Sequence, residues 1–234
     1  METEMQQEDV MVPKEWEDHH RKWFARKVYA ILCMQLGLTS LIVGVVVAVD
    51  KINEWLSINW PFMLCLSLIN VIVLITLLCF KKTARRHPTN LILLGIFTVS
   101  EGLLVGNFAA FFDPLTVLFA AVLALSVTLG ITAYSFYENT DFAPIRGMGF
   151  GMIIGLILWS IFFGLYYDTM MVNLIICLVF ILIYTIFIVM DTRMIVGGGR
   201  WSLSYDDYII GSLCLYIDII GLFIYILSLL GGKK

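Results

Sequence analysis

Charged residues are scarce in this chain: Asp, Glu, Lys and Arg make up only 14% of its 234 residues. Soluble domains carry about 25% charged residues and about 45–50% apolar ones, whereas 60% of this chain is apolar. The composition excludes an ordinary soluble domain and predicts a membrane protein, with lipid as a partner and no nucleic acid. The acidic N-terminal segment lacks the hydrophobic core of a signal peptide, so we expect the first apolar run to act as an uncleaved anchor.

Histidine is also rare, and its three copies, His19, His20 and His87, lie outside every long apolar run. A Ser/His protease or a His-ligated metal site therefore cannot be built inside the membrane. The cysteines fall within apolar runs and show neither a disulfide framework nor zinc spacing; they are Cys33, Cys65, Cys79, Cys177 and Cys214. We expect no enzyme activity and no cofactor.

Long apolar runs dominate what is present. A transmembrane helix needs roughly 20 apolar residues, and seven runs qualify: residues 28–49, 60–80, 90–112, 114–136, 146–166, 171–195 and 208–230. We predict an all-α membrane protein with seven transmembrane helices. Residues 1–27 would form a tail with an interfacial segment, and residues 28–234 a single transmembrane domain.

The segments between the runs carry recognisable helix-ending signals. The segment "DKINE" ends the first run, and an Asp-Pro turn in "FFDPLT" separates the third from the fourth. Glycines in "GGGRWSLSYDD" stop the sixth run. In the same segment, Ser204 followed three residues later by Asp207 predicts a capping box that starts the last helix.

The distribution of Lys and Arg predicts the orientation. Twelve of them fall in the N-terminal tail and in the loops on its side of the membrane, against three on the opposite side. Because positive residues favour the cytoplasmic side, we place the N-terminus in the cytoplasm and the C-terminus in the lumen or outside. The terminal "GGKK" favours the cytoplasm instead, and a re-entrant last segment would reconcile the two.

Three carboxyl groups lie within the predicted spans: Glu101, Asp191 and Asp218. A charge at the centre of a membrane helix costs about 2.5–3.5 kcal/mol on insertion scales, and such residues usually face the protein interior. Asp191 would lie about 6–9 Å from the cytoplasmic interface, and Asp218 about 15 Å. Helix tilt and a helix that continues through "TRMIV" would bring these two depths together.

The neighbours of Asp218 predict which face of its helix packs against protein. Gly211, Cys214, Asp218 and Gly221 share one face, where small residues let other helices approach closely. The remaining surface, which we expect to meet lipid, carries Leu213, Ile217, Ile220 and Ile224. The last helix is therefore expected deep in the bundle, with Asp218 facing protein.

Two carboxyls within hydrogen-bonding reach cannot both ionise cheaply, so they tend to share a proton. Asp191 and Asp218 would form such a pH switch, closed when they share a proton and repelling when both are charged. Oxygen ligands also suit Ca²⁺, and the pair is a possible weak Ca²⁺ site better suited to passage than to storage. Glu101, beside Gly102 and Gly106, is a possible part of the cation path or a structural hydrogen-bonding group.

The C-terminal segment "MDTRMIVGGGRWSLSYDDYIIGSLCLYIDIIGLFIYILSLLG" resembles the signature of the Bax inhibitor-1 family, in particular its Lifeguard and Golgi anti-apoptotic branch. That signature has Asp-Thr at the end of helix 6, Ser and Asp-Tyr before helix 7, and Leu-Tyr-x-Asp-Ile-Ile within it. Further matches are "RKVYAIL", "HPTNLILLGIFTVSEG" and "DF". The resemblance runs from about residue 24 to the end. Two positions depart from the pattern, since Gly221 stands where Asn is frequent and Met190 where Tyr is common.

The resemblance implies a seven-helix fold around helix 7 and a pH-sensitive Ca²⁺ leak that lowers the calcium of stores and restrains apoptosis. It implies that Asp191 and Asp218 are the pH sensor, with Ca²⁺ as the permeant ion. A basic partner would come from Lys81, Lys82, Arg85 or Arg86. Expected partners are Ca²⁺, protons and membrane proteins that regulate apoptosis or conduct Ca²⁺, and the expected location is the Golgi or the endoplasmic reticulum, or else the plasma membrane.

Three other classes fit parts of the pattern. A seven-helix receptor would place the N-terminus outside, against the charge count, and the last span holds no Lys for retinal. An intramembrane aspartyl protease would use the two Asp residues, and cleavage of a membrane substrate would reveal it. A proton- or cation-coupled secondary transporter would show coupled, saturable uptake of a solute instead of passive ion flux.

Overall fold

The computed structural model describes residues 14–137, 170–197 and 202–231, and every regular element in these ranges is a helix. The helices are α1 (Lys14–Ala48), α2 (Asp50–Ile58), α3 (Trp60–Cys79), α4 (Lys81–Ala84), α5 (Thr89–Ala109), α6 (Pro114–Tyr137), α8 (Met170–Val196) and α9 (Tyr208–Leu230). Six of them, all except the short α2 and α4, contain a stretch long and apolar enough to cross a membrane. The chain is a multi-pass membrane protein. The span predicted at residues 146–166 lies outside the described ranges.

The helix ends follow the chemistry of their boundary residues. Proline occupies the first turn of α3 and the first position of α6, where its missing N–H is not needed. Gly197 follows the last residue of α8, as the glycine signal predicted, and its N–H bonds the carbonyl of Arg193. The last predicted span, 208–230, coincides with α9.

One predicted boundary, the start of the first helix, is wrong. The first helix begins at Lys14, well before residue 28, so the segment rich in basic and aromatic residues is a direct extension of the span. At 35 residues α1 is about 52 Å long, more than the ~30 Å hydrocarbon core of a bilayer. The segment "DKINE" does follow the end of the first span, since α1 ends at Ala48. The chain breaks at Val49, in an extended conformation, and resumes as the short helix α2.

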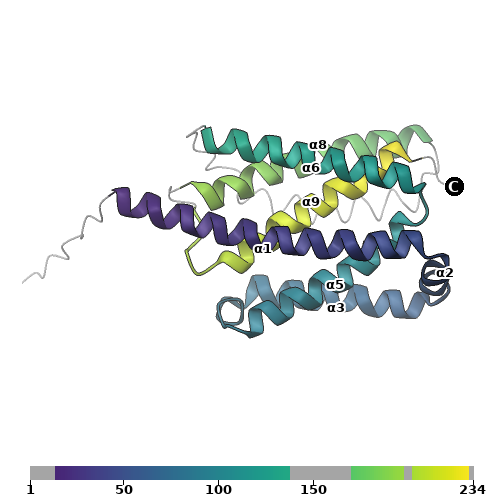
Figure 1. Ribbon diagram of the computed structural model, residues 1–234, viewed down its shortest axis with the longest axis horizontal. Helices are drawn as coiled ribbons and strands as arrows, with labels where there is room; N and C mark the ends of the chain where they lie inside the picture. The colour runs from purple at the N-terminus through teal and green to yellow at the C-terminus, as the bar shows by residue number, and fades with distance from the viewer. Residues whose placement is uncertain (1–13, 138–169, 198–201, 232–234) are drawn as a thin grey trace, which may run out of the picture.

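The last helix lies in the middle of the bundle (Figure 1). Helices α6 and α8 lie on one side of α9, α3 and α5 lie on the other, and α1 runs alongside. Within the apolar stretch of α9, 61% of the residues are buried, against 22% in α3, α6 and α8. Those outer helices expose large apolar side chains such as Leu129 and Trp60, each 68% exposed, which is the surface that lipid contacts.

The prediction that one side of α9 meets lipid is wrong for two of its residues. Leu213 is fully buried and Ile220 is 6% exposed, while Ile217 and Ile224 are half-buried. The reason is that α1, α5, α6 and α8 all contact this helix. The small-residue face does pack closely, since Gly211 lies against Leu203, Ile195 and Val28.

Candidate functional site

The two carboxyls singled out in the sequence are brought together. Asp218 of α9 is 8% exposed, and its side chain interacts with that of Asp191 on α8 through a hydrogen bond and through like charge. The extension of α8 to Val196, which the depth argument required, places Asp191 one and a half turns inside the helix end. Among the residues that the structure describes, Oδ2 of Asp218 has no hydrogen-bond partner.

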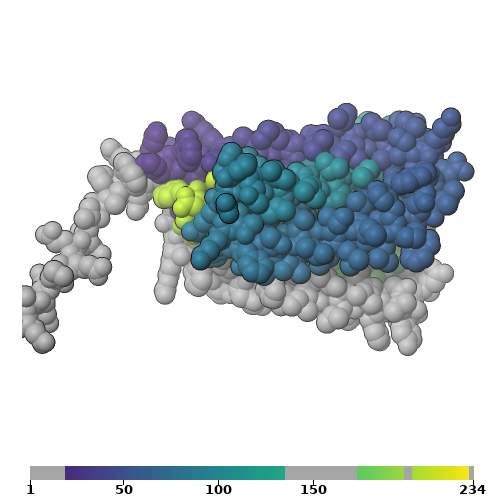
Figure 2. Space-filling model, turned by 90° about the horizontal axis from the view of Figure 1, so that it is seen from below, coloured from purple at the N-terminus to yellow at the C-terminus, as the bar shows by residue number. Residues whose placement is uncertain are grey.

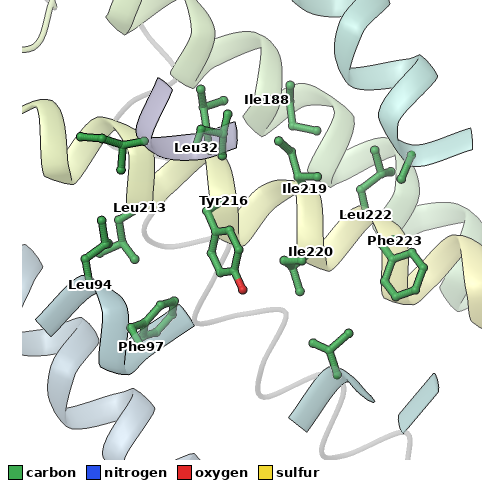
Figure 3. Packing of buried hydrophobic residues seen from close by; sticks show 14 of the residues in the cluster. Leu32, Leu94, Phe97, Ile188, Leu213, Tyr216, Ile219, Ile220, Leu222 and Phe223 are labelled. Atoms are coloured by element: carbon green, nitrogen blue, oxygen red, sulfur yellow. The ribbon is translucent and has the colours of Figure 1, made fainter. Parts of the chain in front are cut away.

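Further buried polar side chains lie along α8 and α9 next to the pair in the sequence. Thr192, next to Asp191, is completely buried, and the Tyr29 hydroxyl of α1 lies near it. Two residues before Asp218, and therefore on roughly the opposite side of α9, the hydroxyl of Tyr216 hydrogen-bonds Thr39 of α1 at 2.7 Å. Figure 3 shows the Tyr216 ring reaching from α9 toward Phe97, with which it makes an edge contact at 6.1 Å between ring centroids. The interior of the bundle is therefore polar at several points along α9.

Glu101, the third carboxyl, is held by a hydrogen-bonded group between α3 and α5. Asn70 of α3 donates to Oε2 of Glu101 at 2.5 Å, and the Asn70 carbonyl oxygen accepts a hydrogen bond from Ser100. Asn70 is 6% exposed. The sequence reasoning missed this residue, although an amide inside the apolar run "LCLSLINVIVLI" was a visible signal that the helix faces a polar partner.

One further residue is within electrostatic range of both Asp218 and Glu101. Tyr184 of α8 interacts electrostatically with both Asp218 and Glu101. Tyr216 also interacts electrostatically with Glu101. Glu101 and the Asp pair are thus both within electrostatic range of Tyr184, while the hydrogen bond of Glu101 is to Asn70. Tyr184 was not among the predicted site residues.

A salt bridge anchors the start of α9. Both oxygens of Asp207 accept hydrogen bonds from Arg85, at 2.8 and 3.0 Å. The hydrogen bond and the negative charge of Asp207 raise the pKa of Arg85, so the guanidinium stays charged. The predicted capping box is wrong, because the Asp207 side chain makes no capping bond; only its backbone N–H bonds the carbonyl of Ser204.

The four candidate basic partners of the Asp pair lie in and just after α4. Arg85 is committed to Asp207, and the side chains of Lys81, Lys82 and Arg86 are exposed at the surface. No hydrogen bond or salt bridge of these four residues joins them to Asp191 or Asp218 in the part of the chain that the structure describes. A local sequence window could not reveal the Arg85–Asp207 pairing, because 122 positions separate the two residues.

A second arginine holds the segment that leads into α9. Arg21 of α1 donates to the carbonyl of Leu203 and to the hydroxyl of Ser202, both at 2.8 Å, and its guanidinium lies 4.7 Å from the centre of the Tyr205 ring. Figure 2 shows this segment, in yellow-green, beside the purple start of α1 and the blue-green residues that follow α3. Residues 202–207 are therefore held by Arg21 of α1 and by Arg85, which directly follows α4.

Replacing Arg85 with Ala should loosen this end of the bundle. Asp207 is 7% exposed at its side chain, so the substitution would leave a nearly buried carboxylate without its bidentate partner. We expect the thermal midpoint in detergent to fall by a few degrees. The exposed neighbour Lys82 provides the control, as Lys82→Ala removes a positive charge from the same helix without breaking this pair. Equal midpoints for the two variants would contradict the assignment.

The described residues contain no group of three or more His, Cys, Asp or Glu side chains that could hold a metal ion. Asp191 and Asp218 supply carboxylate oxygens, the ligand type that Ca²⁺ prefers, but Ca²⁺ takes six to eight oxygens in a tight site. The pair alone therefore supplies too few oxygens for a tight Ca²⁺ site.

The comparisons with known proteins agree with the sequence resemblance. The family model described as "Inhibitor of apoptosis-promoting Bax1" matches residues 21–234. Protein lifeguard 3 of Homo sapiens is 28% identical over 231 residues, which cover 97% of this chain and 74% of the human protein. The mouse protein of the same name is 27% identical over 229 residues. The Golgi anti-apoptotic protein of Vaccinia virus (strain Lister) is 32% identical over 212 residues, which cover 91% of this chain and 86% of the viral protein.

Proposed function

Because the chain belongs to the Bax inhibitor-1 family, whose model matches residues 21–234, we propose that it restrains apoptosis as a pH-sensitive calcium leak of an intracellular membrane. The observation that carries this proposal is the interaction of Asp218 with Asp191 inside the bundle, with one Asp218 oxygen left without a hydrogen-bond partner. Carboxyls at such depth are expensive and rarely serve only as packing groups.

The proposed switch follows from the like charge of the pair. At low pH the two carboxyls share a proton, the hydrogen bond holds α8 against α9, and the path is closed. As the pH rises the shared proton is lost, and two negative charges at hydrogen-bonding distance repel each other. The helices then separate at this level, and the carboxylate oxygens face a passing cation. Flux should therefore rise with pH.

Glu101 extends the proposed path beyond the pair. Its carboxyl is half-buried and, like Asp218, is within electrostatic range of Tyr184. A series of separate carboxyls, none complete as a binding site, lets a divalent cation enter and leave without being trapped.

We further propose that the chain resides in the Golgi. The support is its 32% identity with a viral protein named Golgi anti-apoptotic protein, which extends over 86% of that protein. Exposed apolar side chains on the outer helices imply lipid contact in any membrane.

The test of the leak is calcium flux through the purified protein in liposomes. We expect passive Ca²⁺ entry into vesicles loaded with a calcium dye, and a rate that increases as the pH is raised from about 5 to about 8. Liposomes without protein and liposomes with heat-inactivated protein serve as controls. A flux that is absent, or that stays constant across this range, would refute the proposal.

A further inference from the structure

The ring of Tyr184 on α8 lies directly on Gly221 of α9. A Cβ atom built at Gly221 would lie 2.4 Å from both Cε1 and Cζ of Tyr184 and 2.9 Å from Cδ1. Carbon atoms pack at about 3.5–4.0 Å, so the ring occupies the volume that any side chain at residue 221 would need. The absence of a side chain at Gly221 leaves the space that the Tyr184 ring fills.

Other aromatic residues of the two helices hold the ring in place. Tyr184 stacks on Tyr225 of α9 with ring centroids 5.8 Å apart, and Tyr225 stacks on Phe180 of α8 at 4.3 Å. Tyr184 also makes an edge contact with Phe187 at 6.3 Å. Aromatic pairs of this kind add about 0.5–1.5 kcal/mol beyond their buried area. We call Phe180, Tyr184 and Tyr225 the aromatic layer.

Along the bundle, the aromatic layer begins at the depth of the deepest carboxyl, Glu101. The end of α8 and the starts of α5 and α9 meet at the same end of the bundle (Figure 1). Measured from there at 1.5 Å per residue, Asp191 lies about 8 Å deep, Asp218 about 15 Å and Glu101 about 18 Å. By the same measure Tyr184 lies about 18 Å deep and Gly221 about 20 Å.

Beyond this depth α8 and α9 contain no charged residue and no histidine. The sequence contains no Asp, Glu, Lys, Arg or His from Met170 to Tyr184 or from Gly221 to Leu230. A cation that reaches Asp218 and Glu101 therefore meets an aromatic ring and then apolar helix surface. Hydrophobic constrictions of this kind stop ions because a hydrated ion cannot shed its water there.

We propose that Tyr184, whose ring packs against Gly221, is the residue that closes the inner end of the carboxyl-lined path. The proposal rests on the leak function proposed above and assigns its barrier to one side chain. Tyr184 is in electrostatic range of both carboxyls that end the path, and it is anchored by the aromatic layer. Opening requires this ring to leave Gly221.

The test compares Ca²⁺ flux in liposomes, at one fixed neutral pH, for variants at the two positions. Tyr184→Ala removes the ring and should raise the flux about tenfold, equivalent to ~1.4 kcal/mol off the barrier. Gly221→Ala adds a methyl group where the ring lies and should raise it as well. Tyr184→Phe keeps the ring and should resemble wild type. Gly130→Ala is the matched control, since nothing lies within 4 Å of its added Cβ.

The double variant Gly221→Ala/Tyr184→Ala shows whether both substitutions act through one contact. We expect its flux to equal that of Tyr184→Ala alone, whereas independent effects would multiply. If Tyr184→Ala is not recovered folded, Tyr184→Leu removes the ring while it retains apolar bulk, and its flux is interpreted in the same way.

The outcomes separate this inference from the leak itself. If Asp218→Asn changes the flux and removal of the Tyr184 ring does not, the assignment of the barrier is wrong and the leak stands. Flux through Tyr184→Ala without any flux through wild type supports the barrier and refutes a resting leak. Absence of flux in every variant overturns both.

Discussion

Asp218→Asn should abolish the pH dependence of the calcium flux and hold it at its low-pH level. An Asn amide cannot ionise, yet it can donate a hydrogen bond to the Asp191 carboxyl, as the protonated Asp218 does. The like-charge repulsion that separates α8 from α9 then never develops. At about pH 8 the flux should fall at least about tenfold below wild type, measured in dye-loaded liposomes.

Two further variants make this result interpretable. Asp191→Asn should reproduce it, because either amide removes one of the two charges. Asp206→Asn is the matched control: this Asp is exposed just before α9 and leaves the pair intact. A pH-dependent flux that survives in both Asp191→Asn and Asp218→Asn would show that the pair is not the switch.

Leu222→Ala should destabilise the folded bundle by about 1–3 kcal/mol, whereas Leu129→Ala should have almost no effect. Leu222 of α9 is fully buried and Leu129 of α6 is 68% exposed. In water a buried Leu→Ala substitution costs about 2–5 kcal/mol, the sum of a transfer term and a cavity term. In a bilayer the transfer term largely vanishes, because lipid is as apolar as the protein interior. The cavity and its lost packing contacts remain.

The measurement is unfolding by increasing fractions of a denaturing detergent in mixed micelles, for both variants and wild type. The comparison tests the central position of α9 directly, since the two substitutions are chemically identical. A similar loss of stability for both leucines would mean that α9 meets lipid or detergent as the outer helices do.

Six of the seven spans and the deep position of the last helix were predictable, but how much of its surface other helices cover was not. Runs of 20 or more apolar residues bounded by Gly, Pro or charged residues mark membrane helices, which is why 208–230 coincides with α9. Which sides of that helix meet protein cannot be deduced in the same way. Lipid-facing and protein-facing positions are equally apolar, so Leu213 and Ile220 gave no sign that other helices cover them.

Some residues of the candidate site were predictable from the sequence and others were not. Asp191 and Asp218 were identifiable because a carboxyl in an apolar run is conspicuous, and their short separation along the chain made a meeting plausible. Asp207 was misinterpreted because its spacing from Ser204 matches a capping box. Its actual partner, Arg85, is distant in the sequence and comes near only in the folded chain. Asn70 and Tyr184 were missed because neutral polar residues stand out much less, although they link the carboxyls to neighbouring helices.

The enclosed position of α9 also constrains how the protein is made. Chains are synthesised from the N-terminus, so α9 is the last of the described helices to leave the ribosome, after every helix that surrounds it. Until it arrives, Asp191 and the hydroxyl of Thr39 lack their partners on α9, Asp218 and Tyr216. Entry of α9 is thus the step that completes the bundle, and a ribosome stalled before Tyr208 would leave an open, polar intermediate for the quality-control machinery of the membrane to recognise.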